Sequence, residues 1–273
     1  MRCRICARGC ELAEGALGFC GARRRAGDRT VPENYGRITS LALDPIEKKP
    51  LAMYEPGAMI LSVGSYGCNL DCPFCQNHSI SRARAEHVRW EEIRPEELCR
   101  IAEHYRSAGN IGVAFTYNEP LISFEYMMDT AALLHEAGMK SVLVSNGSVS
   151  EDNAREVIPK TDAMNIDLKC FSDEGYRRLG GDLSQVKTFL ELAACSETHL
   201  EITTLIVPGL SDSPDAMEQE ATWIASLDPK IPLHVTRYFP RYRAEEPATD
   251  VQLVYRLADV ARRFLENVFV GNC

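Results

Sequence analysis

The sequence predicts an α/β fold: an open, partial (β/α)6 barrel, similar to an incomplete TIM barrel, preceded by a small cysteine-rich segment. From about residue 59 onward, short apolar runs alternate six times with longer helical patterns. Strands that alternate with helices pair in parallel through right-handed crossovers. Six such units are fewer than the eight of a closed barrel, so a doubly wound sheet also fits. We expect two parts, a cysteine-rich segment with its connector at 1–58 and the α/β domain at 59–273.

The predicted elements follow one another in a regular order. Residues 1–30 are rich in Cys, Gly and Arg and lack a long apolar period, and 31–58 are expected as an extended connector with turns. Buried strands are predicted from apolar and β-branched runs at 59–63, 111–116, 140–145, 163–168, 199–206 and 232–237. Helices are predicted at 95–108, 122–137, 150–158, 183–195, 214–227 and 249–265.

Composition limits the class of partner and the compartment. The chain has 273 residues, is 45% hydrophobic and carries a formal net charge of −9. Nucleic acid is not an expected partner, because phosphate binding needs a concentrated basic surface, and Arg23-Arg24-Arg25 is expected as a solvated turn. No run approaches the roughly 20 apolar residues that span a bilayer, and no signal peptide is recognisable. We therefore expect a cytoplasmic protein that does not enter a membrane.

Unusual polar segments follow the predicted strands. Residues 67–75 follow the first strand and 117–120 the second, while Ser145-Asn146-Gly147 ends the third. Asp167 to Lys169 ends the fourth, 207–209 follows the fifth, and His234 lies on the sixth. Active sites of parallel α/β folds assemble at the carboxyl edge of the sheet. These segments are therefore expected to converge on one cavity.

The first of these segments contains three cysteines, Cys68, Cys72 and Cys75, in a C-x3-C-x2-C spacing. In a reducing compartment, clustered cysteines indicate metal binding or catalysis rather than disulfides. Short cysteine spacings hold iron–sulfur clusters, and three thiolates leave one iron of a cubane open to another ligand. A zinc site is the alternative, with His78 as its fourth ligand.

A second cysteine group precedes it, formed by Cys3, Cys6, Cys10 and Cys20. Four cysteines can supply every ligand of a closed tetrahedral site. Zinc and an auxiliary [4Fe–4S] cluster both fit a C-x2-C opening. A set of redox-active or metal-free thiols is the remaining alternative.

The three-cysteine motif, with Phe74 before its last cysteine, resembles the signature of the radical S-adenosylmethionine (SAM) superfamily. The surrounding Cys-Pro-Phe-Cys-Gln-Asn resembles the version in pyruvate formate-lyase activating enzyme, and the similarity extends over roughly residues 59–240. The N-terminal cysteine pattern resembles most the radical SAM enzyme of the AmmeMemoRadiSam system. The resemblance implies a [4Fe–4S] cluster at Cys68, Cys72 and Cys75. It also implies reductive cleavage of SAM to methionine and a 5′-deoxyadenosyl radical that abstracts hydrogen from a substrate.

The same resemblance implies roles for residues that bind the charged groups of SAM. Glu119 would accept from the ammonium, although it could instead cap the helix that follows it. Asp167 and Lys169 would bind the ribose or the carboxylate, with a purely structural ion pair as the alternative. Asn118 occupies a place where the family more often has glycine, so its side chain must point away from SAM or narrow the pocket.

Further residues are expected around the rest of the cofactor. Phe74 and Asn77 would border the adenine, although Phe74 could simply pack within its loop. His234 would contact SAM or be a satisfied core histidine. Ser145 and Asn146 would add polar contacts or form only a turn. An acid that activating enzymes often carry at this third strand end is missing here, which weakens the inference of a monovalent cation there.

Partners follow from the resemblance as well. An electron donor such as flavodoxin or ferredoxin is implied, with a protein substrate or an AMMECR1-like or Memo-like protein as further candidates. The substrate is not encoded in any motif. The competing hypothesis is an iron–sulfur electron-transfer protein, or a zinc-binding interaction protein, without radical catalysis.

Overall fold

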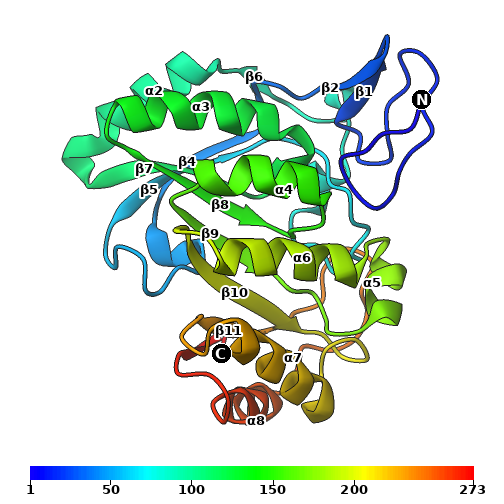
Figure 1. Cartoon of the computed structure of the whole chain (residues 1–273), viewed down its shortest axis with the longest axis vertical. Helices are drawn as coiled ribbons and strands as arrows, with labels where there is room; N and C mark the ends of the chain where they lie inside the picture. Colours follow the sequence, from blue (N-terminus) through cyan, green and yellow to red (C-terminus); the bar gives the residue numbers. More distant parts are fainter.

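An open sheet of eight strands forms the centre of the computed structural model, which covers residues 1–273 (Figure 1). The spatial order is β12-β11-β10-β9-β8-β7-β5-β4, and only β4 runs antiparallel to its neighbour. The two edge strands do not pair with each other, so the barrel is not closed. The strands are β4 Ser40–Pro45, β5 Met59–Gly64, β7 Asn110–Phe115, β8 Lys140–Ser145, β9 Ala163–Asp167, β10 His199–Ile206, β11 Leu233–Arg237 and β12 Val268–Gly271.

All six predicted strands are present, as β5, β7, β8, β9, β10 and β11. Two edge strands were missed. Every residue of β4 is at least partly exposed, so its sequence lacks the continuous apolar run of a central strand. The other, β12, is a short strand of four residues that pairs with β11. The mostly parallel α/β sheet is therefore as expected, and it is wider than the six predicted strands.

Helices cover one face of the sheet, and Figure 1 shows α3, α4 and α6 side by side in front of the strands. The predicted helices are found with small shifts, since α8 ends four residues early and α2 continues as a 3-10 turn. A helix at Asp173–Leu179 was missed, although Ser172 caps its start and Gly180 ends it in the left-handed region. The helices are α1 His78–Ser81, α2 Pro95–His104, α3 Phe124–Glu136, α4 Glu151–Val157, α5 Asp173–Leu179, α6 Leu183–Ala194, α7 Pro214–Leu227 and α8 Val251–Ala261, with 3-10 turns η1 Ile46–Lys48, η2 Ala85–His87, η3 Tyr105–Ala108, η4 Pro120–Ser123 and η5 Ile158–Lys160.

Two short antiparallel pairs lie outside the main sheet. One is the hairpin of β1 Arg23–Ala26 and β2 Arg29–Pro32, and the other joins β3 Arg37–Ile38 to β6 Glu91–Glu92. The solvated turn expected at Arg23 is wrong, because its side chain is buried and bonds both carboxylate oxygens of Glu125 at 2.6 and 2.7 Å. The N-terminal segment is thereby attached to α3.

A second, smaller apolar cluster lies on the face of the sheet that the helices leave uncovered. Ile46 and Leu51, from the segment between β4 and β5, pack against Ile60 and against the small residues Ala114 and Ala163 of the sheet. Small side chains on the strands leave room for this segment. The segment thus closes one end of the sheet and leaves the carboxyl end open. No helix of the protein is long and apolar enough to cross a membrane.

Burial of Glu220 predicts pH-dependent stability. Its carboxyl lies on α7, bonds only Thr204, and burial raises its pKa to about 8. Because the unfolded carboxyl titrates near 4.5, the folded protein binds the extra proton between these values, and the free energy of unfolding falls as pH rises through that window. We expect Glu220→Gln to remove most of this loss, so that the variant gains stability over the wild type at pH 8 but much less at pH 5.

Urea unfolding at both pH values measures this difference. Glu218→Gln is the matched control, because Glu218 lies exposed on the same helix. An unchanged pH dependence in Glu220→Gln would show that Glu220 is not the titrating group.

Candidate functional site

One cavity of about 850 Å³ opens at the carboxyl end of the sheet. The loops that follow β5 and β7 contribute to its wall, together with residues of β8, β9, β10, β11 and β12, as parallel pairing leads one to expect. Every residue predicted around the three-cysteine loop and the cofactor lines this cavity. They are Cys68, Cys72, Phe74, Cys75, Asn77, Asn118, Glu119, Ser145, Asn146, Asp167, Lys169 and His234.

The three cysteines of the loop are free thiols on the cavity wall. The backbone N–H of Leu70 donates to Cys68 Sγ at 3.4 Å, and Cys75 Sγ lies 3.2 Å from Ser81 Oγ. Burial raises the pKa of Cys68 and of Cys72. A metal centre bound here must therefore displace protons from these thiols.

The proposed zinc ligand His78 does not join the cavity. Its ring stacks on Tyr242 with centroids 4.6 Å apart, and its Nδ1 lies 3.2 Å from the carbonyl oxygen of Cys75. No group of three His, Cys, Asp or Glu side chains in the structure could hold a single metal ion as it stands. The alternative of a four-coordinate zinc at this loop therefore has no fourth ligand.

Glu119 is a buried carboxylate without a cationic partner. It caps η4 by accepting from Leu121 N at 3.0 Å, as the alternative reading of the sequence expected. It also accepts from Ser145 Oγ at 2.6 Å and from Asn146 N at 2.9 Å. Burial raises its pKa against these three bonds. A carboxylate offers about four lone pairs, so capacity for one further donor remains.

Ser145 and Asn146 form more than a turn. Besides its bond to Glu119, Ser145 Oγ accepts from Gly147 N at 3.0 Å. Asn146 Nδ2 donates to Asn69 Oδ1 at 3.0 Å and lies 3.7 Å from Cys68 Sγ. The end of β8 is therefore bonded to both Glu119 and the cysteine loop.

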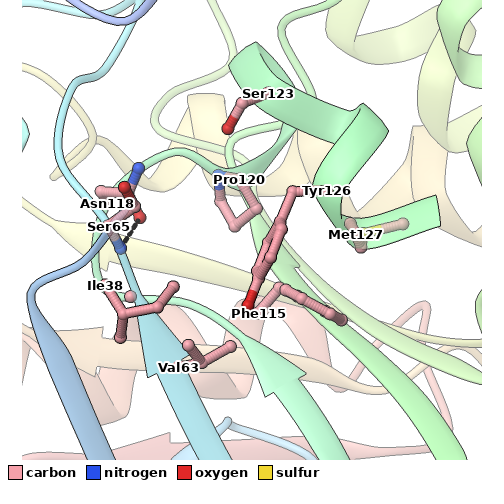
Figure 2. Close-up of a pocket in the computed structure, with 10 residues that line it drawn as sticks. Ile38, Val63, Ser65, Phe115, Asn118, Pro120, Ser123, Tyr126 and Met127 are labelled. Atoms are coloured by element: carbon pink, nitrogen blue, oxygen red, sulfur yellow. Dashed lines mark hydrogen bonds between the residues drawn. The ribbon is translucent and has the colours of Figure 1, made fainter. Parts of the chain in front are cut away.

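The Asn118 side chain is held by the turn before Cys68 (Figure 2). Its Oδ1 accepts from Ser65 N at 2.9 Å, and its Nδ2 donates to the carbonyls of Tyr66 and Gly67, each at 3.2 Å. The Asn118 amide therefore bonds backbone groups of this turn that a glycine at position 118 could not reach. These bonds direct the side chain to the turn, while the residue also lines the cavity.

Asp167 and Lys169 form an ion pair of 2.7 Å on the cavity wall. Burial alone would lower the pKa of Lys169, but Asp167 and the thiols of Cys72 and Cys75 outweigh it and raise that pKa. Lys169 therefore stays charged beside the cysteine loop. The pair is both a structural contact and a charged surface of the cavity, so the two readings of the sequence are compatible.

Phe74 and Asn77 border the cavity from the loop itself. Phe74 packs edge-on against Tyr238 with centroids 6.4 Å apart and is almost fully buried. Asn77 Nδ2 donates to the carbonyl of Tyr117 at 2.8 Å. Phe74 therefore both packs against Tyr238 and lines the cavity.

His234 is fixed by a residue that the sequence analysis missed. Its Nε2 bonds Glu201 Oε2 at 2.6 Å, and its ring stacks on Phe269. Glu201 is fully buried and also accepts from the backbone N–H groups of Ala52 and Met53 at 3.0 and 2.8 Å. The only sequence signal was an acid inside a buried strand.

A second group that the sequence analysis missed supports the cavity wall near Lys49 and Tyr117. Lys49 is buried and pairs with Asp44 at 3.0 Å, and Tyr117 donates to the same carboxylate at 3.0 Å. Tyr117 adopts φ +71°, a left-handed conformation that is strained for a residue other than glycine. No sequence pattern marks this trio, because Tyr117 lies 73 residues from Asp44.

The N-terminal cysteines lie outside the cavity. The Cys6 thiol lies within electrostatic range of those of Cys3, Cys10 and Cys20. Cys10 Sγ accepts from Phe19 N at 3.5 Å. The chain therefore contains two separate cysteine sets.

The cavity fits a cluster and SAM on two observations. Three free thiols converge from one loop, and iron–sulfur clusters use thiolates as ligands. Glu119 is buried and forms no ion pair. Because buried charges require partners, an ammonium group bound in the cavity would stabilise this carboxylate.

Comparisons with known proteins agree with this site. The profile of the radical SAM superfamily matches residues 62–223. An uncharacterised protein of Methanocaldococcus jannaschii is 33% identical over 275 residues, which cover 100% of this chain and 81% of that protein. The pyruvate formate-lyase-activating enzyme of Clostridium pasteurianum is 27% identical over 163 residues, which cover 59% of this chain and 67% of that enzyme.

Solved structures share the fold. Streptococcus suis SuiB bound to S-adenosylmethionine superposes with a TM-score of 0.61 at 15% identity, covering 78% of this chain and 52% of that one. A radical SAM methyltransferase from Sphaerobacter thermophilus gives 0.59 at 16% identity, covering 80% and 67%. The chain thus spans about half the length of SuiB.

Removing Glu201 tests the support of the cavity wall. We expect Glu201→Ala to lower the free energy of unfolding by about 3 kcal/mol or more, because several buried donors lose their acceptor at once. Chemical unfolding near neutral pH measures the loss, and Glu197→Ala, at an exposed position before the same strand, is the control. Equal stability of the two variants would mean that Glu201 does not hold the wall together.

Proposed function

Because this chain belongs to the radical SAM superfamily, we propose that it is an enzyme that binds a [4Fe–4S] cluster through Cys68, Cys72 and Cys75 and cleaves SAM reductively. When bound, the cluster and SAM together supply methionine and a 5′-deoxyadenosyl radical that abstracts hydrogen from the substrate. One observation carries the proposal. Three thiols, an unpaired buried carboxylate and a charged lysine face a single cavity at the carboxyl end of the sheet.

The proposed polar contacts to SAM use opposite charges on neighbouring strand ends. Glu119 would accept from the ammonium with its remaining lone pair, held in orientation by Ser145 and Asn146. Lys169 would attract the carboxylate, and Asp167 would keep Lys169 charged and bond the ribose. SAM carries both an ammonium and a carboxylate, so such a site needs both signs.

The proposed adenine contacts lie on the loop side of the cavity. Phe74 offers an aromatic face held by Tyr238, and Asn77 offers an amide whose orientation is set by the Tyr117 carbonyl. His234 would contact the cofactor through the ring that Glu201 positions.

The substrate is the least constrained part of the proposal. The relatives among activating enzymes support a protein substrate and an electron donor such as flavodoxin or ferredoxin. The N-terminal cysteine pattern supports placement in the AmmeMemoRadiSam system, with an AMMECR1-like or Memo-like partner. We further propose that residues 59–273 act as a partial (β/α)6 barrel, with 1–58 as an accessory segment. The cavity wall from β12 and from the segment after β11, which carries none of the proposed cofactor contacts, is then available to the substrate.

Removing the three loop cysteines tests the cluster. Cys68→Ala/Cys72→Ala/Cys75→Ala should lose the iron and sulfide of that site after anaerobic reconstitution, together with formation of 5′-deoxyadenosine under dithionite, because no other group in the cavity provides thiolates. Iron analysis, absorption spectroscopy and chromatography measure these changes, with Cys99→Ala as control. A triple variant that still cleaves SAM would sink the assignment. A wild type that holds the cluster but never cleaves SAM would favour an electron-transfer protein instead.

Neutralising the two charged residues tests the SAM contacts. We expect Glu119→Gln and Lys169→Met each to weaken SAM binding by one to two decades, since a charge-assisted bond contributes roughly 1.5–3 kcal/mol. The cluster should persist in both variants. Calorimetric titration of the reconstituted proteins measures the affinity, with the exposed pair Glu156→Gln and Lys160→Met as charge-matched controls. Wild-type affinity in both test variants would mean that these residues serve the fold alone.

A further inference from the structure

The N-terminal cysteine segment is packed directly against the loop that carries Cys68. Arg8 Nε donates to the carbonyl of Asn69. Gly67 faces the carbonyl of Cys20 so closely that a Cβ there would lie 2.5 Å from that oxygen. Ile5 O accepts from Ser150 N at 2.9 Å, which attaches the same segment to the start of α4. Movement of the N-terminal segment would therefore disturb the cysteine loop.

Two arginines share one aromatic ring at this contact. The Arg8 guanidinium lies 3.4 Å from the centroid of Phe19, and that of Arg82 lies 4.5 Å from it. Arg82 donates to the carbonyls of Cys68 and Leu70 at 3.4 and 3.0 Å. The stack of Arg8, Phe19 and Arg82 thus connects the segment of the four cysteines with the backbone of the three-cysteine loop.

The charges at this stack need a negative partner. Two guanidiniums on one ring repel each other, and the one carboxylate that pairs with Arg82, Asp71, lies 3.7 Å away and is partly exposed. Arg8 lies within electrostatic range of Cys6 and Cys10 and of the same carboxylate, Asp71, so one carboxylate serves both guanidiniums. Neutral thiols would supply no compensation, whereas four thiolates around a divalent zinc, or around an oxidised [4Fe–4S] core, carry a net charge of about −2.

Two of the four sulfurs lie near the same glycine. Sγ atoms of Cys10 and Cys20 lie at almost equal distance from Gly18, 3.8 and 3.7 Å from the position of a Cβ there. Phe19 N donates to Cys10 Sγ, a bond that strengthens when the sulfur is a thiolate. As in the three-cysteine loop, the sulfurs do not enclose a single-ion site as they stand. A cluster spreads its thiolates over separate irons, while zinc would draw them inward to about 2.3 Å.

We propose that Cys3, Cys6, Cys10 and Cys20 hold a thiolate-bound metal centre, and that this centre braces the three-cysteine loop through Arg8 and Phe19. Binding of Zn²⁺, or of a preformed [4Fe–4S]²⁺ core, releases the four thiol protons to solvent and involves no change of oxidation state. Phe19 and Arg8 are then positioning residues for the loop that we propose to carry the radical cluster. The metal centre itself does not depend on that proposed function.

Metal counting tests the centre. The full chain is reconstituted anaerobically with iron and sulfide in one arm and with zinc added in the other. We expect either about eight irons and eight sulfides per chain, or about four of each with one zinc. Cys10→Ser/Cys20→Ser should lose the surplus, and Cys195→Ser, at an exposed position, should keep it. A metal content of the wild type that Cys10→Ser/Cys20→Ser leaves unchanged would overturn the proposal.

Hydrogen exchange tests the bracing. Arg8→Met keeps all four cysteines, so it should retain both metals while amide exchange in residues 66–75 rises at least several-fold. Arg25→Met is the control, because its guanidinium bonds carbonyls of Leu12 and Gly27 within the N-terminal segment. Wild-type exchange in a metal-loaded Arg8→Met would overturn the bracing. Failure of the wild type to cleave SAM, with both metals and exchange as expected, would count only against the proposed function.

Discussion

The loop that leaves β5 has to satisfy its backbone polar groups without forming a helix or strand. Buried carbonyl and N–H groups need partners, and here they come from elsewhere in the sequence. Asn118 bonds Ser65, Tyr66 and Gly67, while Arg8 and Arg82 donate to carbonyls further along. The loop is therefore held by side chains of other elements, and the positions of Cys68 and its neighbours depend on those elements being in place.

Sequence patterns predicted the parts of the fold that depend on local chemistry. The central strands are rich in apolar and β-branched residues because parallel strands are buried on both faces. The carboxyl ends of those strands share one edge, so residues as distant as Phe74 and His234 were expected to line a common cavity, and they do. The missed edge strand β4 has exposed side chains and derives its stability from pairing with β5, which no local pattern reports.

Partners distant in the sequence explain the remaining errors. Arg23 looked like part of a solvated run, but Glu125, about a hundred residues away, provides two hydrogen bonds and an ion pair that make its burial tolerable. Glu201 was missed altogether, because its partners are His234 and the backbone of Met53, both distant in the sequence. Whether a charged residue is exposed or buried depends on such partners, and these become visible only in three dimensions.

Glu119 joins the loop, the sheet and the cavity in one residue. Its backbone N–H donates to the carbonyl of Gly67 at 3.2 Å, while its carboxylate accepts from the end of β8 at Ser145 and Asn146. Every donor to that carboxylate is neutral, so its charge is solvated by dipoles but balanced by no cation. A cationic group bound in the cavity would pair with a residue that connects the ends of β7 and β8 to the cysteine loop. Occupancy of the cavity and rigidity of the loop are for that reason expected to rise together.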